Sequence, residues 1–136
     1  MSILIIEDNH FMALTMKTHL EALGYQSVSS ADSAERALAL LETESFDLLL
    51  VDWVLPNMSG LELVRQVRKR ERHADVSIIM CTGQGKMEDL LEAVESGADD
   101  YIVKPAKRET LQQKVAKAVG LPRKKPEGYA ISTIKK

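Results

Sequence analysis

Short runs of apolar and β-branched residues alternate along this chain with segments whose apolar residues recur every three or four positions. The short runs cover residues 2–6, 25–29, 47–52, 76–81 and 101–103. They predict five strands, because unbroken apolar runs of this length are typical of strands that are buried on both faces.

The segments between and after these strands predict five helices. The first is expected to end at Gly24 and the fourth at Gly97, since glycine commonly follows the last turn of a helix. Asp32, with Glu35 three residues later, has the character of a capping box before the second helix. The charged run at 65–72 is interpreted as the solvated face of the third helix. The apolar positions that set the helical spacing are Met12, Met16, Leu20 and Leu23; Ala34, Ala37, Leu38 and Leu41; Leu61, Val64 and Val67; Leu90, Leu91 and Val94; and Leu111, Val115, Ala118 and Val119.

Strictly alternating strands and helices predict an α/β fold with one doubly wound, five-stranded parallel sheet. Parallel neighbours need right-handed crossover connections, which place helices on both faces of the sheet. Ligands of such sheets bind beyond the carboxyl ends of the strands. Functional residues are therefore expected where the predicted strands end.

The composition fits one compact domain that works in an aqueous compartment. The chain has 136 residues, of which 45% are hydrophobic and 28% charged. No apolar run approaches the roughly 18 residues that a membrane span needs, and the N-terminus lacks the pattern of a secretory signal, so we expect a cytoplasmic protein without membrane contact.

The single cysteine, Cys81, excludes an internal disulfide and is expected in the core. His10, His19 and His73 lack metal-ligand spacing and are interpreted as surface or helix-packing residues.

Charge is spread unevenly along the chain. The net charge is −2, but residues 121–136 carry five basic residues against one acidic residue, which leaves −6 for residues 1–120. An acidic body argues against direct nucleic-acid binding, which needs a basic face to neutralise phosphates. We expect a folded domain at 1–120 and a basic tail at 121–136 that is either disordered or a truncated linker.

Three carboxylates lie at predicted strand ends. Glu7 and Asp8 follow the first strand, and Asp52 ends the third. If those strands are neighbours, the acids converge, and converging carboxylates at neutral pH usually hold a hard cation. Oxygen ligands of this kind point to Mg²⁺. Each acid taken singly could instead be an ordinary loop or capping residue.

Two further strand ends bring a hydroxyl and a cation to the same edge. Thr82 ends the fourth strand and Lys104 ends the fifth. Together with the acids, they supply what phosphoryl transfer to a carboxylate requires: a nucleophilic oxygen, a divalent ion, and donors for the phosphate oxygens. Asp52 is the expected nucleophile, because a rigid apolar strand holds it.

With these residues in this order, the chain resembles the receiver domains of two-component response regulators. The resemblance covers residues 2 to about 120 and implies a flavodoxin-like fold with strand order 2-1-3-4-5. No one of its motifs is specific alone, but their order on matching elements is. The matching residues are Glu7, Asp8 and Asn9; Asp52 with Pro56 and Gly60; Thr82 with Gly83; and Lys104 with Pro105.

The resemblance implies a role for each of the site residues. Asp52 would accept a phosphoryl group from a histidine kinase or a histidine phosphotransfer protein. Asp8, Asp52 and the backbone carbonyl of Val54 would hold Mg²⁺, with Glu7 acting through a water. Lys104 would pair with the phosphoryl group. Such a domain catalyses its own phosphorylation and dephosphorylation, and it is not an enzyme in the ordinary sense.

The resemblance also implies how the signal leaves the site. Thr82 would move to hydrogen-bond the phosphoryl group, and Tyr101 would turn into the space left behind, although Tyr101 could also be an ordinary half-buried strand residue. The face made by the fourth helix, fifth strand and fifth helix would then bind a downstream protein. The resemblance does not decide whether phosphorylation also causes dimerisation. The Lys104–Pro105 peptide bond is expected to be cis.

Some positions depart from common family patterns. Leu55 and Ser59 replace more frequent residues, and Val54 and Gln84 occupy positions that tune the lifetime of the phosphate. Because an apolar Val54 cannot orient an attacking water, we hypothesise a fairly persistent aspartyl phosphate.

Two other classes of protein could also account for parts of this sequence pattern. Phosphatases of the haloacid dehalogenase class need a second acid two residues after the nucleophile, where this chain has Val54. A flavin-binding electron carrier would need a phosphate-cradling loop after the first strand, where Glu7 and Asp8 would repel the phosphate. As to output, the roughly 16 residues after the last helix leave no room for a DNA-recognition domain, which favours docking or relay.

Overall fold

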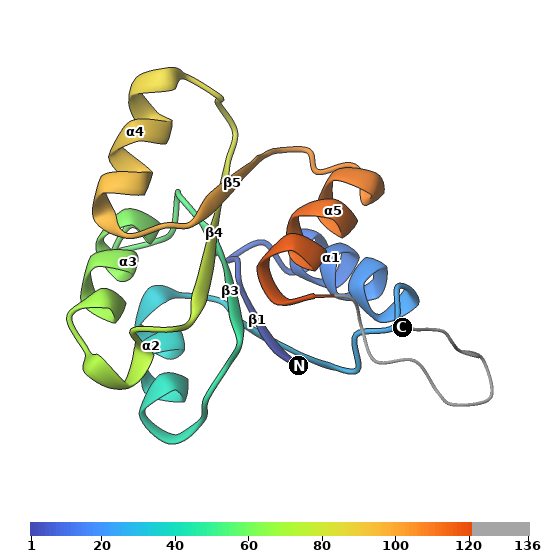
Figure 1. Cartoon of the computed structure of the whole chain (residues 1–136), viewed down its shortest axis with the longest axis horizontal. Helices are drawn as coiled ribbons and strands as arrows, with labels where there is room; N and C mark the ends of the chain where they lie inside the picture. Colours follow the sequence, from blue (N-terminus) through green and yellow to red (C-terminus); the bar gives the residue numbers. More distant parts are fainter. Residues whose placement is uncertain (121–136) are drawn as a thin grey trace.

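The computed structural model describes residues 1–120, and within them the five predicted strands form one parallel sheet (Figure 1). The strand order is β2-β1-β3-β4-β5, as expected. The predicted tail at 121–136 lies outside the described residues. The strands are β1 (Ser2–Ile6), β2 (Ser27–Ala31), β3 (Leu48–Asp52), β4 (Ser77–Thr82) and β5 (Asp100–Val103).

The helices of residues 1–120 cover both faces of the sheet, as the alternation predicted. Figure 1 shows α1 and α5 on one face and α2, α3 and α4 on the other. A short 3-10 helix, η1 (Glu71–His73), follows α3. The helices are α1 (His10–Ala22), α2 (Ala34–Thr43), α3 (Gly60–Arg68), α4 (Met87–Ser96) and α5 (Arg108–Val119).

The central strands are buried on both faces and feed two separate cores. Ile3 and Ile5 of β1 pack toward α1 and α5, whereas Leu4 and Ile6 pack toward α2 and α3. This two-residue period follows from the pleat of the strand, which sends successive side chains to opposite faces. Cys81 of β4 is buried in the core on the α1 and α5 side, as predicted.

The start of the second helix differs from the prediction. Ser33, not Asp32, is the N-cap of α2, and its side chain accepts a hydrogen bond from the backbone N–H of Arg36. Asp32 instead forms an ion pair with Arg36 one turn away. Serine and aspartate cap helices about equally well, so the sequence alone could not choose between adjacent candidates.

The second strand begins two residues later than predicted. Tyr25 precedes β2 and is buried, and its hydroxyl donates to the carbonyl oxygen of Gly120 at the end of α5. The strand is shifted because Tyr25 belongs to this long-range contact rather than to the sheet edge. The boundaries of β3 and β5 differ from the prediction by one residue at the first position, and β4 is shifted by one residue at both ends.

The interpretation of residues 65–72 as a solvated helix face is correct for Arg65 and Lys69, which are exposed, but wrong for Arg68. The helix ends at Arg68, whose side chain is only 21% exposed. Its guanidinium donates to the carbonyl oxygens of Gly97 and His73 and pairs with Asp99. A residue expected in water therefore joins α3 to the end of α4 and the start of β5.

His73 in η1 is buried, with 4% of its surface exposed. Burial is the main cause that lowers the pKa of this imidazole, and the neighbouring Arg72 adds to it.

Across residues 1–120, the helices are all too short or too polar to cross a bilayer.

Candidate functional site

The carboxyl ends of four strands meet at one edge of the sheet and bring the predicted acids together. One carboxylate oxygen from each of Glu7, Asp8 and Asp52 lies within 4.8 Å of the others. β1 and β3 are neighbours in the sheet, so residues that follow them emerge side by side. The predicted convergence of these three side chains is confirmed.

The chain after β1 holds Glu7 in a fixed orientation. Its backbone N–H donates to the carbonyl oxygen of Ala31 at the end of β2. Its Oε2 accepts from the backbone N–H of Asn9, which is itself the N-cap of α1. Glu7 is buried, whereas Asp8 beside it is exposed. The two adjacent acids therefore have different surroundings: one faces the protein and the other faces solvent.

Asp52 is the last residue of β3 and is almost fully buried. The following loop folds back over it, and the backbone N–H of Gly60 donates to the carbonyl oxygen of Trp53. A side chain at Gly60 would collide with the carbonyl oxygen of Asp52, so this position requires glycine. Val54 lies at the rim of the site, with its side chain 76% exposed.

Lys104, which directly follows β5, lies between two of the acids. Its Nζ is 3.1 Å from Oε1 of Glu7 and 3.1 Å from Oδ1 of Asp52. Burial disfavours the charged ammonium, but the hydrogen bonds to both carboxylates outweigh it, and the pKa of Lys104 lies above its ordinary value. The structure therefore favours the positively charged form of Lys104 at this edge of the sheet.

The same geometry acts on Glu7. Burial raises the pKa of its carboxyl above the ordinary value, against the lowering effect of the hydrogen bonds from Asn9 and Lys104. The site contains three carboxylates and one ammonium, so its net charge is negative when all three acids are ionised. An oxygen-rich, acidic, partly open site of this kind suits Mg²⁺, which binds through one or two carboxylates and keeps several waters.

Thr82 lies at the end of β4 and is buried. Its hydroxyl donates to the carbonyl oxygen of Gln84 at 2.9 Å and accepts from the backbone N–H of Gln84 at 3.1 Å. The hydroxyl is therefore engaged within its own loop, on the next strand along from Asp52.

Tyr101 is half-buried on β5, and Lys114 of α5 packs against its ring. The ammonium of Lys114 lies 4.5 Å from the centre of the Tyr101 ring and pairs with Oδ1 of Asp100 at 2.8 Å. Sequence reasoning missed Lys114, because nothing in the spacing between β5 and α5 marks residues 101 and 114 as neighbours. The Lys104–Pro105 peptide bond is cis, as the resemblance implied.

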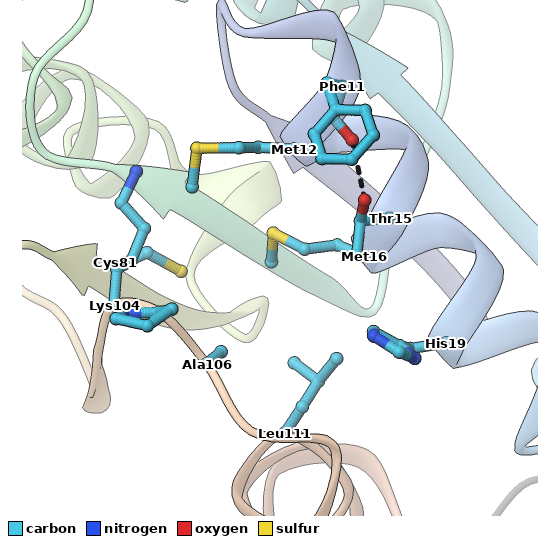
Figure 2. A pocket seen from close by; sticks show the side chains of 10 residues that line it. Phe11, Met12, Thr15, Met16, His19, Cys81, Lys104, Ala106 and Leu111 are labelled. Atoms are coloured by element: carbon cyan, nitrogen blue, oxygen red, sulfur yellow. Dashed lines mark hydrogen bonds between the residues drawn. The ribbon is translucent and has the colours of Figure 1, made fainter.

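An apolar pocket of about 210 Å³ lies beside the site, between α1 and the segment after β5 (Figure 2). Met12 and Met16 reach into it from α1, toward the sulfur of Cys81, and Leu111 of α5 closes it from below in this view. Burial raises the pKa of the Cys81 thiol to about 12, so it stays a neutral thiol. Sequence reasoning did not find this pocket, since its walls come from four separate elements.

Comparison with known proteins gives one consistent result. The family profile described as "Response regulator receiver domain" matches residues 3–116. Chemotaxis protein CheY of Pseudomonas aeruginosa is 36% identical over 117 residues, which are 86% of this chain and 94% of that protein.

Two solved structures share the fold and its flavodoxin-like topology. A CheY-like response regulator receiver domain protein from Methanospirillum hungatei has a TM-score of 0.79 at 35% identity, covering 87% of this chain and 92% of that one. The receiver domain of a sensor histidine kinase from Pseudomonas aeruginosa has a TM-score of 0.79 at 30% identity, covering 88% and 97%. The latter structure holds a magnesium ion coordinated in its active site cleft.

Proposed function

Because the chain belongs to the family of response regulator receiver domains, which are phosphorylation-activated switches of two-component signalling, we propose that Asp52 is its phosphoryl acceptor. Receiver domains are signalling switches rather than enzymes in the ordinary sense. The observation that carries the proposal is the meeting of Glu7, Asp8 and Asp52 at one edge of the sheet, where Lys104 pairs with Glu7 and Asp52.

The proposed reaction is a direct displacement at phosphorus. An Oδ of Asp52 attacks, the bond from phosphorus to the donor nitrogen breaks, and the donor imidazole keeps that electron pair and takes up a proton. The donor is a phosphohistidine of a histidine kinase or of a histidine phosphotransfer protein. Burial and the rigid strand hold Asp52 in position, which lowers the entropic cost of bringing the carboxylate and the phosphorus together.

Asp8 and Asp52 would hold Mg²⁺, together with the backbone carbonyl of Val54. The ion would supply positive charge for the phosphoryl oxygens, which a site with an excess of carboxylates otherwise lacks. The magnesium ion in the related kinase receiver domain supports this assignment. Lys104 neutralises a second phosphoryl oxygen, since it already lies 3.1 Å from Oδ1 of Asp52.

Thr82 and Tyr101 are proposed to carry the signal outward. The Thr82 hydroxyl would exchange Gln84 for a phosphoryl oxygen, and Tyr101 would turn into the vacated space. The face of α4, β5 and α5 would then bind a downstream protein in the cytoplasm, with or without dimerisation. Apolar side chains exposed on this face support such docking: Met87, Leu91 and Val94 on α4, and Val103 on β5.

The direct test is chemical phosphorylation followed by intact-mass analysis. With acetyl phosphate and Mg²⁺, the wild-type chain should gain the mass of one phosphoryl group, and Asp52→Asn should gain none. Chelation of the metal should abolish the gain. A labelled Asp52→Asn protein, or an unlabelled but folded wild type, would overturn the proposal.

A further inference from the structure

The outward side of α4 carries two parallel stripes of different chemistry, which together form what we term the α4 face. In each stripe the residues lie at positions i, i+4 and i+7, which place side chains above one another on a helix. The apolar stripe consists of Met87, Leu91 and Val94, each more than half exposed. The acidic stripe, one position further along the chain, consists of Glu88, Glu92 and Glu95, which are also exposed.

The acidic stripe is largely without counter-charges in the described part of the chain. Of its own residues, α4 contributes four acidic ones and no basic one. Among residues 1–120, Glu92 pairs with Arg65 at 3.7 Å, and neither Glu88 nor Glu95 takes part in an ion pair. Exposed apolar side chains rimmed by polar ones mark interaction surfaces. A partner that complements the α4 face presents apolar side chains next to basic ones.

The chain itself contains a segment with this chemistry. Residues 129–136 combine three large apolar residues with two lysines: Tyr129, Ile131, Ile134, Lys135 and Lys136. They belong to the stretch 121–136 that carries +4, whereas residues 1–120 carry −6. Because both parts belong to one chain, their attraction acts at a high effective concentration whatever the concentration of the protein.

The segment can reach the α4 face, because α5 ends close to the residues that follow α4. The hydroxyl of Ser77, at the start of β4, donates to the carbonyl oxygen of Ala118 in the last turn of α5. The carbonyl oxygen of the next strand residue, Ile78, accepts from the backbone N–H of Asp99, three residues after α4. From there, the eight residues 121–128 can span up to about 26 Å when extended. The apolar stripe is only about 10 Å long.

We propose that residues 129–136 dock on the α4 face of the same chain, with their apolar residues on the apolar stripe and their lysines beside the acidic one. The α4 face is part of the surface proposed to bind a downstream protein, so such a partner has to displace the segment. This regulatory consequence rests on the proposed function, whereas the docking itself does not.

The other exposed apolar pair on a helix of residues 1–120 does not match the segment. Phe11 and Leu14 of α1 are 78% and 62% exposed. From His10 to Leu20, however, α1 has no acidic residue, and it carries Lys17. A basic segment finds no counter-charge there, so charge favours α4, and Leu14 becomes a matched control for Leu91.

Carbodiimide crosslinking of the full chain, followed by peptide mass analysis, detects the contact directly. The reagent joins a lysine amine to a carboxylate in direct contact with it, as an amide bond with loss of water. Lys135 or Lys136 should be linked to the acidic stripe at least about fivefold more often than to Glu35 and Glu44, the exposed acids of α2 and its C-cap. A mixture of unlabelled and isotope-labelled protein shows whether each link lies within one chain.

Two matched variants test the apolar stripe. Leu91→Gln should lower the yield of these links at least about fivefold, because most of a leucine side chain loses its apolar contact. Leu14→Gln removes a leucine of similar exposure from α1 and should leave the yield unchanged. Leucine and glutamine have similar helix propensities, so both helices should persist.

Nuclear magnetic resonance gives a second readout that needs no chemical reagent. Backbone order parameters of residues 129–136 should lie above about 0.6 in the wild type and in Leu14→Gln, and below that value in Leu91→Gln.

Three results would overturn the inference: links spread evenly over α2 and α4, a yield that Leu91→Gln leaves unchanged, or links mainly between two chains, which would assign the α4 face to a second copy. All measurements use unphosphorylated protein. A chain that is never labelled on Asp52 can therefore still show the contact, and a labelled chain can lack it, so failure of the two proposals can be told apart.

Discussion

The residues around Asp52 leave almost no free volume on the side of α3. Gly60 begins α3, and a methyl group at this position would meet the carbonyl oxygen of Asp52 and the side chain of Val51. Gly83, which follows Thr82, has open space instead. Both glycines belong to the same site, but only Gly60 is sterically restricted to glycine by its neighbours. This difference can be measured as a difference in stability.

Gly60→Ala should therefore destabilise the fold by about 1–3 kcal/mol, the usual range for forcing a group into a packed interior. Urea unfolding followed by circular dichroism measures the change. Gly83→Ala is the matched control and should stay within about 0.5 kcal/mol, as most exposed substitutions do. Equal effects of both substitutions would contradict the packing described here.

We expect Val54 to affect hydrolysis of the proposed aspartyl phosphate rather than the packing around Asp52. Its side chain is exposed at the rim of the site and offers no hydrogen-bonding group. Val54→Asn should shorten the half-life of the aspartyl phosphate several-fold, because an amide can orient the attacking water. The decay of labelled protein after removal of the donor gives the half-life, and an unchanged value counts against this role.

Sequence reasoning identified the chemical groups of the site more completely than their contacts. Asp52, Thr82 and Lys104 were found because each ends or follows an apolar run. The direct pairing of Glu7 with Lys104 was missed, because it joins residues 97 positions apart across two intervening strands. Side-chain reach across a sheet depends on strand order and twist, which a single sequence does not reveal.

At the scale of elements, Arg68 joins α3 to the residues that follow α4. Arg68 donates to the carbonyl oxygen of Gly97, just after α4, and pairs with Asp99 at 3.0 Å. Oδ2 of Asp99 also accepts the backbone N–H of Ile78 at the start of β4. The sequence predicted the five α-helices and five strands of residues 1–120 in order, but not η1. It could not predict the link through Arg68 either, because a surface arginine and a shielded one look alike in a charged run.

Arg68→Met should weaken the fold by about 2 kcal/mol, since it removes charged hydrogen bonds from a largely shielded side chain while keeping the aliphatic stem. Arg65→Met is the control: Arg65 is 45% exposed, and its ion pairs are 3.7 Å long. Exposed pairs of that kind contribute less than about 1 kcal/mol. Urea unfolding compares the two, and an equal loss would contradict the structural role of Arg68.

At the scale of the whole molecule, one parallel sheet separates two cores, and the chemistry lies at one edge of that sheet. His73 is set apart from the site, in η1, and is buried near Leu41 and Glu42 at the end of α2. Among residues 1–120 its Nε2 has no hydrogen-bond partner. Arg70, Arg72 and Glu42 are the charged groups around it, and the arginines oppose its protonation.

Global stability should therefore fall as the solution is made acidic. The pKa of His73 is lowered below 6.5 in the folded chain, so below about pH 6.5 the unfolded chain binds a proton that the folded chain does not. The free energy of unfolding then decreases by at most about 1.4 kcal/mol per pH unit, until the folded pKa is reached. His73→Gln should remove this component, which is read as the difference between the two proteins in urea unfolding at pH 7.5 and 5.5. Parallel pH profiles would exclude His73 as the cause.

Separate strand ends are proposed to assemble one site for a divalent ion and a phosphoryl group. A crystal structure with Mg²⁺ and beryllium fluoride, whose tetrahedral adduct mimics a phosphoryl group, tests it most directly. We expect the adduct on Asp52, the ion on Asp8 and Asp52, and Lys104 against a fluoride. An ion or adduct bound elsewhere, or a folded protein that takes up neither at saturating concentrations, would contradict it.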